Sequence, residues 1–362
     1  MISKLPPLFI GGLKINIPII QAGMGVKVST AALASAVAIY GGAGTIASVG
    51  LATSLVAAST DYVDTSNKAL QKEIRQARKQ TKEVVGVNIM VASSNYKEMV
   101  LTAVNEDVDF IISGAGLPLS LPEYTKGSSI KLIPIVSSAR SAEVILKAWS
   151  RRYKRLPDAI VVEGPMAGGH LGFKAKDLIA NTTDCLETIV TDVLAMIEKY
   201  RKVGGAEIPV IAAGGIFDGK DIARFFKIGA KGVQIGTRFV ATNECHAPDS
   251  FKELYVAAKK EDIIIIKSPV GMPGRAIRTK FIDRVINGEN IPFQCNYQCL
   301  RSCDFKNAQY CIAKAMHNAA IGDLDNAIVF AGENVFRVKE IVSVKTLMDE
   351  LVAETIKELN KA

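Results

Sequence analysis

The stretch Val210-Ile-Ala-Ala-Gly-Gly-Ile-Phe-Asp-Gly219 indicates a short buried strand, a glycine turn and the start of a helix. Four consecutive apolar residues, without alternating polar positions, are typical of a strand covered on both faces, as in parallel sheets. The Gly-Gly pair ends the strand, and the amphipathic stretch that begins at Gly219 completes one strand–helix unit. Repetition of this unit along a chain specifies an α/β fold with a parallel sheet.

The unit recurs through the first 240 residues. We expect strands at residues 17–21, 44–48, 84–90, 110–113, 132–137, 159–163, 210–213 and 232–236, and helices such as 141–152, 183–203 and 219–228. Eight such strands predict a (β/α)8 TIM barrel. A doubly wound sheet is the alternative, but the first turn, Gln21-Ala-Gly-Met-Gly25, lacks the G-x-G-x-x-G spacing of a dinucleotide-binding turn.

The alternation stops after residue 240. Residues 241–280 contain a helical stretch, the run Ile263-Ile-Ile-Ile266 and the Pro/Gly-rich segment Ser268-Pro-Val-Gly-Met-Pro-Gly-Arg275. We therefore expect residues 1–240 to form the barrel. Residues 241–362 are expected to form a lid and C-terminal cap packed on the barrel, with four cysteines gathered at 295–311.

Composition and charge exclude several classes of protein. With 49% hydrophobic and 22% charged residues, the 362-residue chain is neither disordered nor a coiled coil. The net charge of +8 is dispersed, which argues against a nucleic-acid partner and suits an anionic small molecule or an acidic carrier protein. No apolar run is long enough to span a membrane and no secretory signal is evident, so we expect a cytoplasmic protein without a membrane partner. The sequence leaves open whether the chain forms a homodimer.

Glycines at the ends of the last two expected strands predict a phosphate site. Gly214 and Gly215 follow the strand at 210–213, and Gly236 and Thr237 follow the strand at 232–236. Backbone N–H groups of these loops would converge on an anion, helped by the N-terminus of the helix that starts at Gly219. A TIM barrel commonly binds phosphate at this place, and flavin mononucleotide (FMN) or a sugar phosphate would fit. Two tight turns without a ligand are the alternative.

His170 is the candidate catalytic residue. It is one of three histidines, and it stands in Ala167-Gly-Gly-His-Leu-Gly172, just beyond the sixth expected strand. Flanking glycines would let a large planar ligand approach closely, and a histidine facing that ligand can exchange a proton near neutral pH. A structural role is the alternative for His170, and it is the role that we expect for His317.

Five segments of the chain resemble the nitronate monooxygenase family, formerly called 2-nitropropane dioxygenases. They are Pro18-Ile-Ile-Gln-Ala-Gly-Met24, Gly86-Val-Asn-Ile-Met90, Glu163-Gly-Pro-Met-Ala-Gly-Gly-His-Leu-Gly172, Ile211-Ala-Ala-Gly-Gly-Ile216 and Gln234-Ile-Gly-Thr-Arg-Phe239. The same superfamily contains flavin-dependent enoyl-acyl-carrier-protein reductases and NADH:quinone reductases. The resemblance extends from about residue 8 to about residue 285 and implies a TIM barrel that binds FMN.

The resemblance also implies roles for individual residues. His170 would be the base that deprotonates a nitroalkane, or the proton donor in an enoyl reductase. Met166 departs from the family, which usually has Glu at this position. The residues expected to bind the phosphate are Gly214, Gly215, Gln234, Gly236 and Thr237, and those expected around the ribityl chain and ring are Ala22, Gly23, Met24, Asn88, Glu163 and Gly168.

Nitronate monooxygenase activity, in which O2 oxidises alkyl nitronates, is the function that the resemblance favours. One alternative is NAD(P)H-dependent reduction of an enoyl thioester or of a quinone. A non-catalytic flavin- or phosphate-binding regulator is an alternative of another class. The expected partners are thus a nitronate or an enoyl thioester, together with O2 or NAD(P)H.

Four of the six cysteines follow one another as Cys295-x3-Cys299-x3-Cys303-x7-Cys311. This spacing matches neither a common zinc motif nor a ferredoxin motif, and cytosolic thiols stay reduced, so we expect free thiols and no metal site. A metal or iron–sulfur site is the alternative, because clustered cysteines of cytosolic chains often bind metal. In both cases the cluster follows the barrel, and we expect it to be dispensable for flavin binding.

Overall fold

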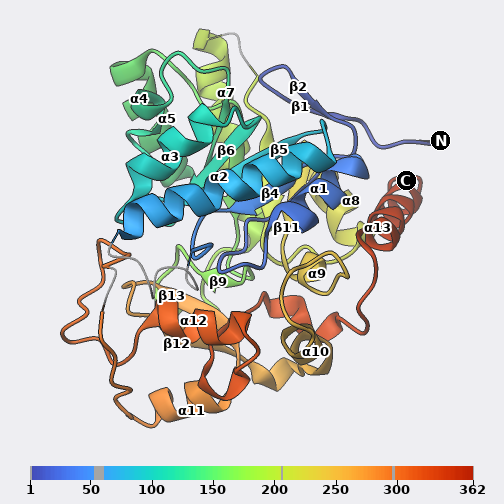
Figure 1. Ribbon diagram of the computed structural model, residues 1–362. Coiled ribbons are helices and arrows are strands. Elements are labelled where there is room, and N and C mark those ends of the chain that lie inside the picture. Colours follow the sequence, from blue (N-terminus) through green and yellow to red (C-terminus); the bar gives the residue numbers. More distant parts are fainter. Residues whose placement is uncertain (1, 53–60, 205–206, 296–297, 362) are drawn as a thin grey trace.

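Eight parallel strands form the centre of the computed structural model, which describes residues 2–52, 61–204, 207–295 and 298–361 (Figure 1). The strands are β3 (Ile19–Gln21), β4 (Gly44–Ala47), β5 (Val85–Met90), β6 (Phe110–Gly114), β7 (Lys131–Val136), β8 (Ile160–Glu163), β10 (Val210–Ala213) and β11 (Gly232–Ile235). They pair in the order β3-β11-β10-β8-β7-β6-β5-β4. Backbone hydrogen bonds from Gln21 N to Ala43 O (3.0 Å) and from Ala43 N to Ile19 O (2.9 Å) join the two edges. The predicted TIM barrel and its eight strands are confirmed.

Helices surround the barrel, and the last of them comes from the end of the chain. The surrounding helices are α1 (Ala31–Ile39), α2 (Tyr62–Gln80), α3 (Tyr96–Asn105), α4 (Leu121–Tyr124), α5 (Ala139–Tyr153), α7 (Leu186–Gly204), α8 (Gly219–Ile228) and α13 (Val344–Leu359). Helix α13 packs against both α8 and α1 and buries Leu347, Met348 and Leu351 (Figure 1). Segment 241–362 therefore contributes to the helical ring, and the division of the chain at residue 240 stays a prediction. Among the described residues, no helix is long and apolar enough to cross a membrane.

An N-terminal hairpin closes one end of the barrel. Its strands are β1 (Leu8–Ile10) and β2 (Leu13–Ile15), which pair antiparallel. Leu8, Ile10 and Ile15 are buried in the same apolar cluster as barrel side chains such as Phe110 and Ile211. The turn of the hairpin lies beside Lys131 and Asp158, where β7 and β8 begin. The carboxyl ends of the strands therefore face the opposite opening, where barrel enzymes place their active sites.

A second layer, the cap, lies over this opening (Figure 1). Its core contains Phe281, Tyr310, Ile312 and Ala315. The cap sheet also includes β9 (Gly169–His170), which lies in the loop after barrel strand β8 and pairs antiparallel with β13 (Pro273–Ile277). The remaining elements are β9 (Gly169–His170), α6 (Ala175–Ile179), α9 (Thr237–Val240), α10 (Asp249–Ala257), η2 (Lys260–Asp262), β12 (Ile263–Lys267), β13 (Pro273–Ile277), α11 (Lys280–Ile286), α12 (Ile312–Ala320), η3 (Leu324–Asn326), β14 (Val329–Phe330) and η4 (Glu333–Arg337).

Candidate functional site

A cavity of about 340 Å³ lies where the carboxyl ends of the barrel strands meet the cap. Its volume falls in the range of small-molecule sites, and side chains of both layers form its wall. All the site residues predicted from the sequence line this one cavity: Ala22, Gly23, Met24, Asn88, Glu163, Gly168, His170, Gly214, Gly215, Gln234, Gly236 and Thr237. The structure thus brings the predicted residues together, and their individual roles stay predictions.

Two glycine loops of the cavity wall offer backbone donors. Gly214 and Gly215 have φ angles of +90° and +92°, in the region that favours glycine. Within the described part of the chain, no residue accepts a hydrogen bond from the backbone N–H of Gly215, Gly236 or Thr237. Three unused donors around one corner of the cavity can bind an anion.

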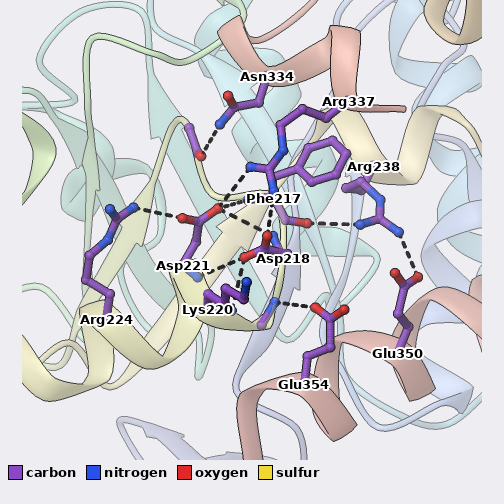
Figure 2. Close-up of polar contacts among 12 residues, drawn as sticks. Phe217, Asp218, Lys220, Asp221, Arg224, Arg238, Asn334, Arg337, Glu350 and Glu354 are labelled. Carbon is purple, nitrogen blue, oxygen red and sulfur yellow. Dashed lines mark hydrogen bonds and ion pairs between the residues drawn. The ribbon is translucent and has the colours of Figure 1, made fainter. Parts of the chain in front are cut away.

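The N-terminus of α8 does not belong to this anion site, contrary to the expectation from the sequence. Asp218 caps the helix by accepting hydrogen bonds from Lys220 N and Asp221 N, both at 3.0 Å. Gly219 N donates to Glu354 Oε2 of α13 at 2.9 Å (Figure 2). Side-chain carboxylates therefore use the first N–H groups of α8. Only the loop donors of Gly215, Gly236 and Thr237 remain for an anion.

The loop after β10 is held from outside the cavity. The ring of Phe217 lies between the guanidinium groups of Arg337, at 4.2 Å, and Arg238, at 4.6 Å (Figure 2). Arg238 also pairs with Glu350 of α13 at 2.8 Å, and Asn334 Nδ2 donates to Gly215 O at 2.6 Å. Contacts from η4 and α13 thus restrain the glycine loop before any ligand binds.

Glycines 23 and 168 line the cavity and also pack closely against other parts of the chain. A Cβ atom on Gly23 would lie 2.2 Å from Asn88 Cβ, and one on Gly168 would lie 2.5 Å from the carbonyl carbon of Ala331. Both glycines therefore allow two parts of the chain to pack closely. At Gly169 φ is +76° and an added Cβ would meet no atom within 4 Å, and the expected approach of a ligand beside His170 stays a prediction.

The cap holds His170 in place. Nε2 of His170 lies 2.8 Å from Oγ of Ser268, and this oxygen also accepts a hydrogen bond from Val270 N at 3.3 Å. The ring of Phe330 packs edge-on against the imidazole with 5.0 Å between ring centroids. Sequence reasoning missed both partners. Ser268 opens the Pro/Gly-rich segment 268–275 of the predicted lid and cap, whereas no sequence signal pointed to Phe330.

Burial shifts the two ionisable groups of the cavity in opposite directions. It lowers the pKa of His170 from 6.5 to about 4 and raises the pKa of Glu163 from 4.5 to about 7. At neutral pH the imidazole is therefore uncharged, and a large fraction of the Glu163 carboxyl group is protonated. A neutral imidazole can accept a proton, and a carboxyl with a pKa near 7 can exchange one.

These shifts make opposite contributions to the pH dependence of stability. The native state binds more protons at Glu163 between pH 4.5 and about 7, so this group lowers the unfolding free energy as pH rises. The unfolded state binds more protons at His170 between about pH 4 and 6.5, so His170 raises the unfolding free energy as pH rises through this range. Glu163→Gln removes the contribution of Glu163, which lowers the unfolding free energy as pH rises. Urea unfolding of this variant should give a free energy that rises more steeply with pH between 4.5 and 6.5 than in the wild type.

The exposed residue Glu340 provides the control for this measurement. Glu340→Gln should follow the wild-type profile. A Glu163→Gln profile parallel to that of the wild type would show that Glu163 has no raised pKa in the native state.

Arg275 joins the cap to the loop that follows β8. Its buried guanidinium donates hydrogen bonds to Pro165 O and to Ala167 O (2.7 Å), and it forms an ion pair with Glu333 at 2.8 Å. Glu333 N in turn donates to Met166 O at 3.0 Å. The fork of Arg can serve three partners at once, which a Lys ammonium on a flexible stem cannot do with the same geometry.

Arg275→Lys should therefore destabilise the protein through an unsatisfied buried carbonyl. The expected loss is about 1–3 kcal/mol, measured as the free energy of unfolding in urea. Arg278→Lys is the matched control, because Arg278 forms an exposed ion pair with Asp283 and its exchange should cost about 1 kcal/mol or less. Equal losses in the two variants would contradict the role given to Arg275.

A profile of the nitronate monooxygenase family matches residues 7–354. The chain belongs to the nitronate monooxygenase family. A probable nitronate monooxygenase of Staphylococcus aureus (strain JH9) is 30% identical to it, over 75% of this chain and 78% of that protein. A 5-hydroxy-7a-methyl-1-oxo-octahydro-1H-indene-4-carboxyl-CoA dehydrogenase of Mycobacterium tuberculosis is 30% identical over 75% of this chain. That match spans 66% of the length of the dehydrogenase, slightly less than two thirds.

Solved structures agree with this membership of the family. FabK from Thermotoga maritima is 29% identical and superposes with a TM-score of 0.75, covering 96% of this chain and 95% of that one. Nitroalkane oxidase from Streptomyces ansochromogenes has a TM-score of 0.73 over 96% of this chain and 98% of its own, and at 20% identity it shows the fold alone. The relatives are named as monooxygenase and dehydrogenase, so the comparisons place the chain among oxidoreductases.

Proposed function

We propose that this protein is an FMN-dependent nitronate monooxygenase, which oxidises alkyl nitronates with O2. The observation that carries the proposal is the position of His170, an uncharged imidazole in the wall of a cavity that also has an anion-binding corner. Membership of the family supports the same reaction.

The residues present fit FMN. Oε1 of Gln234 is buried and, among the described residues, has no hydrogen-bond partner, although Gln234 lines the cavity. A ligand hydroxyl or ring N–H would satisfy this acceptor, and a phosphate would satisfy the N–H groups of Gly215, Gly236 and Thr237. A single phosphate group with a polar chain and a planar ring matches this set. The missing dinucleotide turn favours FMN over FAD.

The roles of the chain's own residues follow from their places in the cavity. Asn88 and Glu163 would hydrogen-bond to the ribityl chain and ring, beside the turn at residues 22–24. Bound flavin supplies the electron transfer. His170 would accept the proton that a nitroalkane loses from its α-carbon, and Ser268 at 2.8 Å would fix the orientation of the imidazole.

Reduction of an enoyl thioester with NAD(P)H is the second candidate. It is supported by the name of a relative that acts on a carboxyl-CoA, and by a solved enoyl reductase domain with a similar fold. That reaction needs His170 to donate a proton, for which a pKa lowered to about 4 is unfavourable at neutral pH. We rank it below nitronate oxidation because the nitronate monooxygenase profile matches residues 7–354, and a non-catalytic regulator below both because the relatives are named as enzymes.

Anaerobic stopped-flow absorbance tests the proposal directly. The purified protein is mixed separately with NADH, NADPH, an alkyl nitronate and crotonyl thioester, and the flavin absorbance is followed. We expect the nitronate to bleach the flavin. Bleaching by NADH or NADPH, followed by reoxidation with crotonyl thioester and no response to nitronate, would establish the reductase instead. A colourless protein that FMN cannot reconstitute would refute the choice of cofactor.

A further inference from the structure

The wall of the central cavity has a polar part and an apolar part. Asn88, Glu163 and Gln234 come from barrel strands, and His170 comes from β9. The cap contributes large apolar and aromatic side chains instead, among them Phe251, Tyr255, Ile312, Met316, Ile328 and Phe330. A substrate that enters the cavity therefore meets two surfaces of different chemistry.

The apolar part of the wall begins beside His170 and continues to α12. The ring of Phe330 packs edge-on against the imidazole, with 5.0 Å between ring centroids. Two residues earlier, Ile328 N donates to Ala315 O of α12 at 3.2 Å, so this stretch of chain connects the imidazole to the helix. An apolar group that starts at a carbon atom beside His170 can therefore extend along Phe330 and Ile328 toward α12.

One face of α12 lines the cavity along most of the helix. Ile312, Met316 and Ala319 follow one another at i, i+4 and i+7, which places them in one row on the helix. A row of this spacing is about 10 Å long, comparable to an extended alkyl chain of several carbon atoms. Met316, in the middle of the row, has a flexible unbranched side chain that adapts to the shape of an apolar partner.

Tyr255 adds no free polar group to this surface. Its hydroxyl donates a hydrogen bond to Phe330 O, and its ring stacks on the ring of Phe251 with 5.5 Å between centroids. The one polar atom of the Tyr255 side chain is thus paired with the backbone. What Tyr255 offers to the cavity is its aromatic ring.

The cavity wall offers no cationic side chain to the far end of a substrate. Among the described residues that line the cavity there is neither Lys nor Arg. A carboxylate placed between Phe330 and Met316 would lose its hydration without gaining an ion pair, which is strongly unfavourable. The wall therefore discriminates against substrates whose far end is charged.

We propose that the substrate is a nitronate with a long, uncharged alkyl chain, which lies along Phe330, Ile328 and the lining face of α12. The reacting carbon lies beside His170, and the side chains of α12 determine which chains are accepted. The inference rests on the proposed function for the nitronate group, whereas the alkyl-chain site follows from the cavity wall alone. Short nitronates and nitro-carboxylates are poor substrates on this view, because they leave the apolar wall uncovered or bring a charge to it.

Binding of unreactive alkyl amides tests the alkyl-chain site without turnover. Calorimetric titration of the flavin-loaded protein with butanamide, hexanamide and octanamide should give a Kd that falls about fourfold for each added CH2 group. Adipic acid monoamide has a carboxylate where hexanamide has its terminal methyl group, and its Kd should be higher by about tenfold or more. A constant Kd along the amide series would overturn the inference, and so would equal binding of hexanamide and the monoamide.

Ala313→Phe tests the contribution of α12. Ala313 lines the cavity next to Ile312, and a benzyl side chain there would occupy the space expected for the alkyl chain. The variant should lose most of the preference for octanamide over butanamide. Lys314→Phe is the matched control, since Lys314 is an exposed residue of the same helix outside the cavity wall, and it should keep the wild-type preference.

Circular dichroism verifies that both variants are folded, and Met316→Phe replaces Ala313→Phe if the latter is not. The same preference for octanamide in the folded Ala313→Phe variant and in its control would contradict the place given to the alkyl chain.

Turnover separates this inference from the proposed function. Oxygen consumption with the nitronates of 1-nitropropane, 1-nitrobutane and 1-nitrohexane should give a kcat/KM that rises with chain length. Equal kcat/KM values for the three would overturn the inference and leave the proposed function in place. Amide binding that tightens with chain length, in a protein that oxidises none of the nitronates, would refute the proposed function and support the alkyl-chain site.

Discussion

Replacement of His170 by Asn should leave the FMN content normal and slow the turnover of a neutral nitroalkane by about 10²–10⁴-fold. Asparagine is close in size to histidine and keeps hydrogen-bonding capacity toward Ser268, but it cannot accept a proton near neutral pH. Cofactor binding should survive, because the predicted phosphate donors belong to the loops after β10 and β11 and not to β9.

A preformed nitronate separates the proton step from the later steps. It has already lost its α-proton, so His170→Asn should slow its oxidation much less than that of the nitroalkane. Steady-state oxygen consumption with both substrates gives the comparison, and His246→Asn, at an exposed position, is the control. Equal losses on both substrates would mean that His170 orients the substrate or stabilises charge. Unchanged rates would remove His170 from the mechanism.

Gly215→Asp should greatly weaken FMN binding. The new side chain would start beside Met166, in the wall of the cavity to which Gly236 and Thr237 also belong, and would bring a negative charge to the proposed phosphate site. At about 4 Å from a phosphate in partly buried surroundings, repulsion between two unit charges amounts to about 4 kcal/mol, or roughly a thousandfold in Kd. Titration of the flavin-free protein with FMN, followed by flavin fluorescence, measures the change.

Gly215→Asn is the control that isolates the charge. Both side chains meet the same obstacles, a φ of +92° and a Cβ position 2.9 Å from Met166 Cβ. They differ in the charge of the carboxylate. The Kd of the Asp variant should therefore exceed that of the Asn variant by most of the predicted factor. Similar Kd values would mean that the phosphate does not bind in this corner.

Strand positions and site residues were predictable because the relevant signals are local. Runs such as 210–213 are continuously apolar, and each is followed at once by glycine or a small polar residue. A barrel brings the carboxyl ends of its strands to one opening, so any list of strand-end residues becomes a list of neighbours in space. For that reason Asn88, Glu163 and Gln234, from three separate strands, line one cavity.

Contacts over long sequence separations could not be predicted. Ser268 lies 98 positions after His170, and Glu354 lies 135 positions after Gly219, whose N–H group it occupies. Pairing of β9 with β13 depends on backbone hydrogen bonds that no residue pattern encodes. The helix at Gly219 has the sequence of an anion-binding turn. Its N–H groups are not available to an anion, because they already donate hydrogen bonds to the carboxylates of Glu354 in α13 and of Asp218.

The place of α13 between α8 and α1 has a consequence for synthesis on the ribosome. All eight strands emerge before the cap is translated, and α13, whose side chains Leu347, Met348 and Leu351 are buried in the folded protein, emerges after it. Until then the nascent barrel exposes an apolar groove between its first and its last strand–helix units. While more than a hundred further residues, from 236 to 343, leave the exit tunnel, this exposed apolar groove makes the nascent chain prone to aggregation.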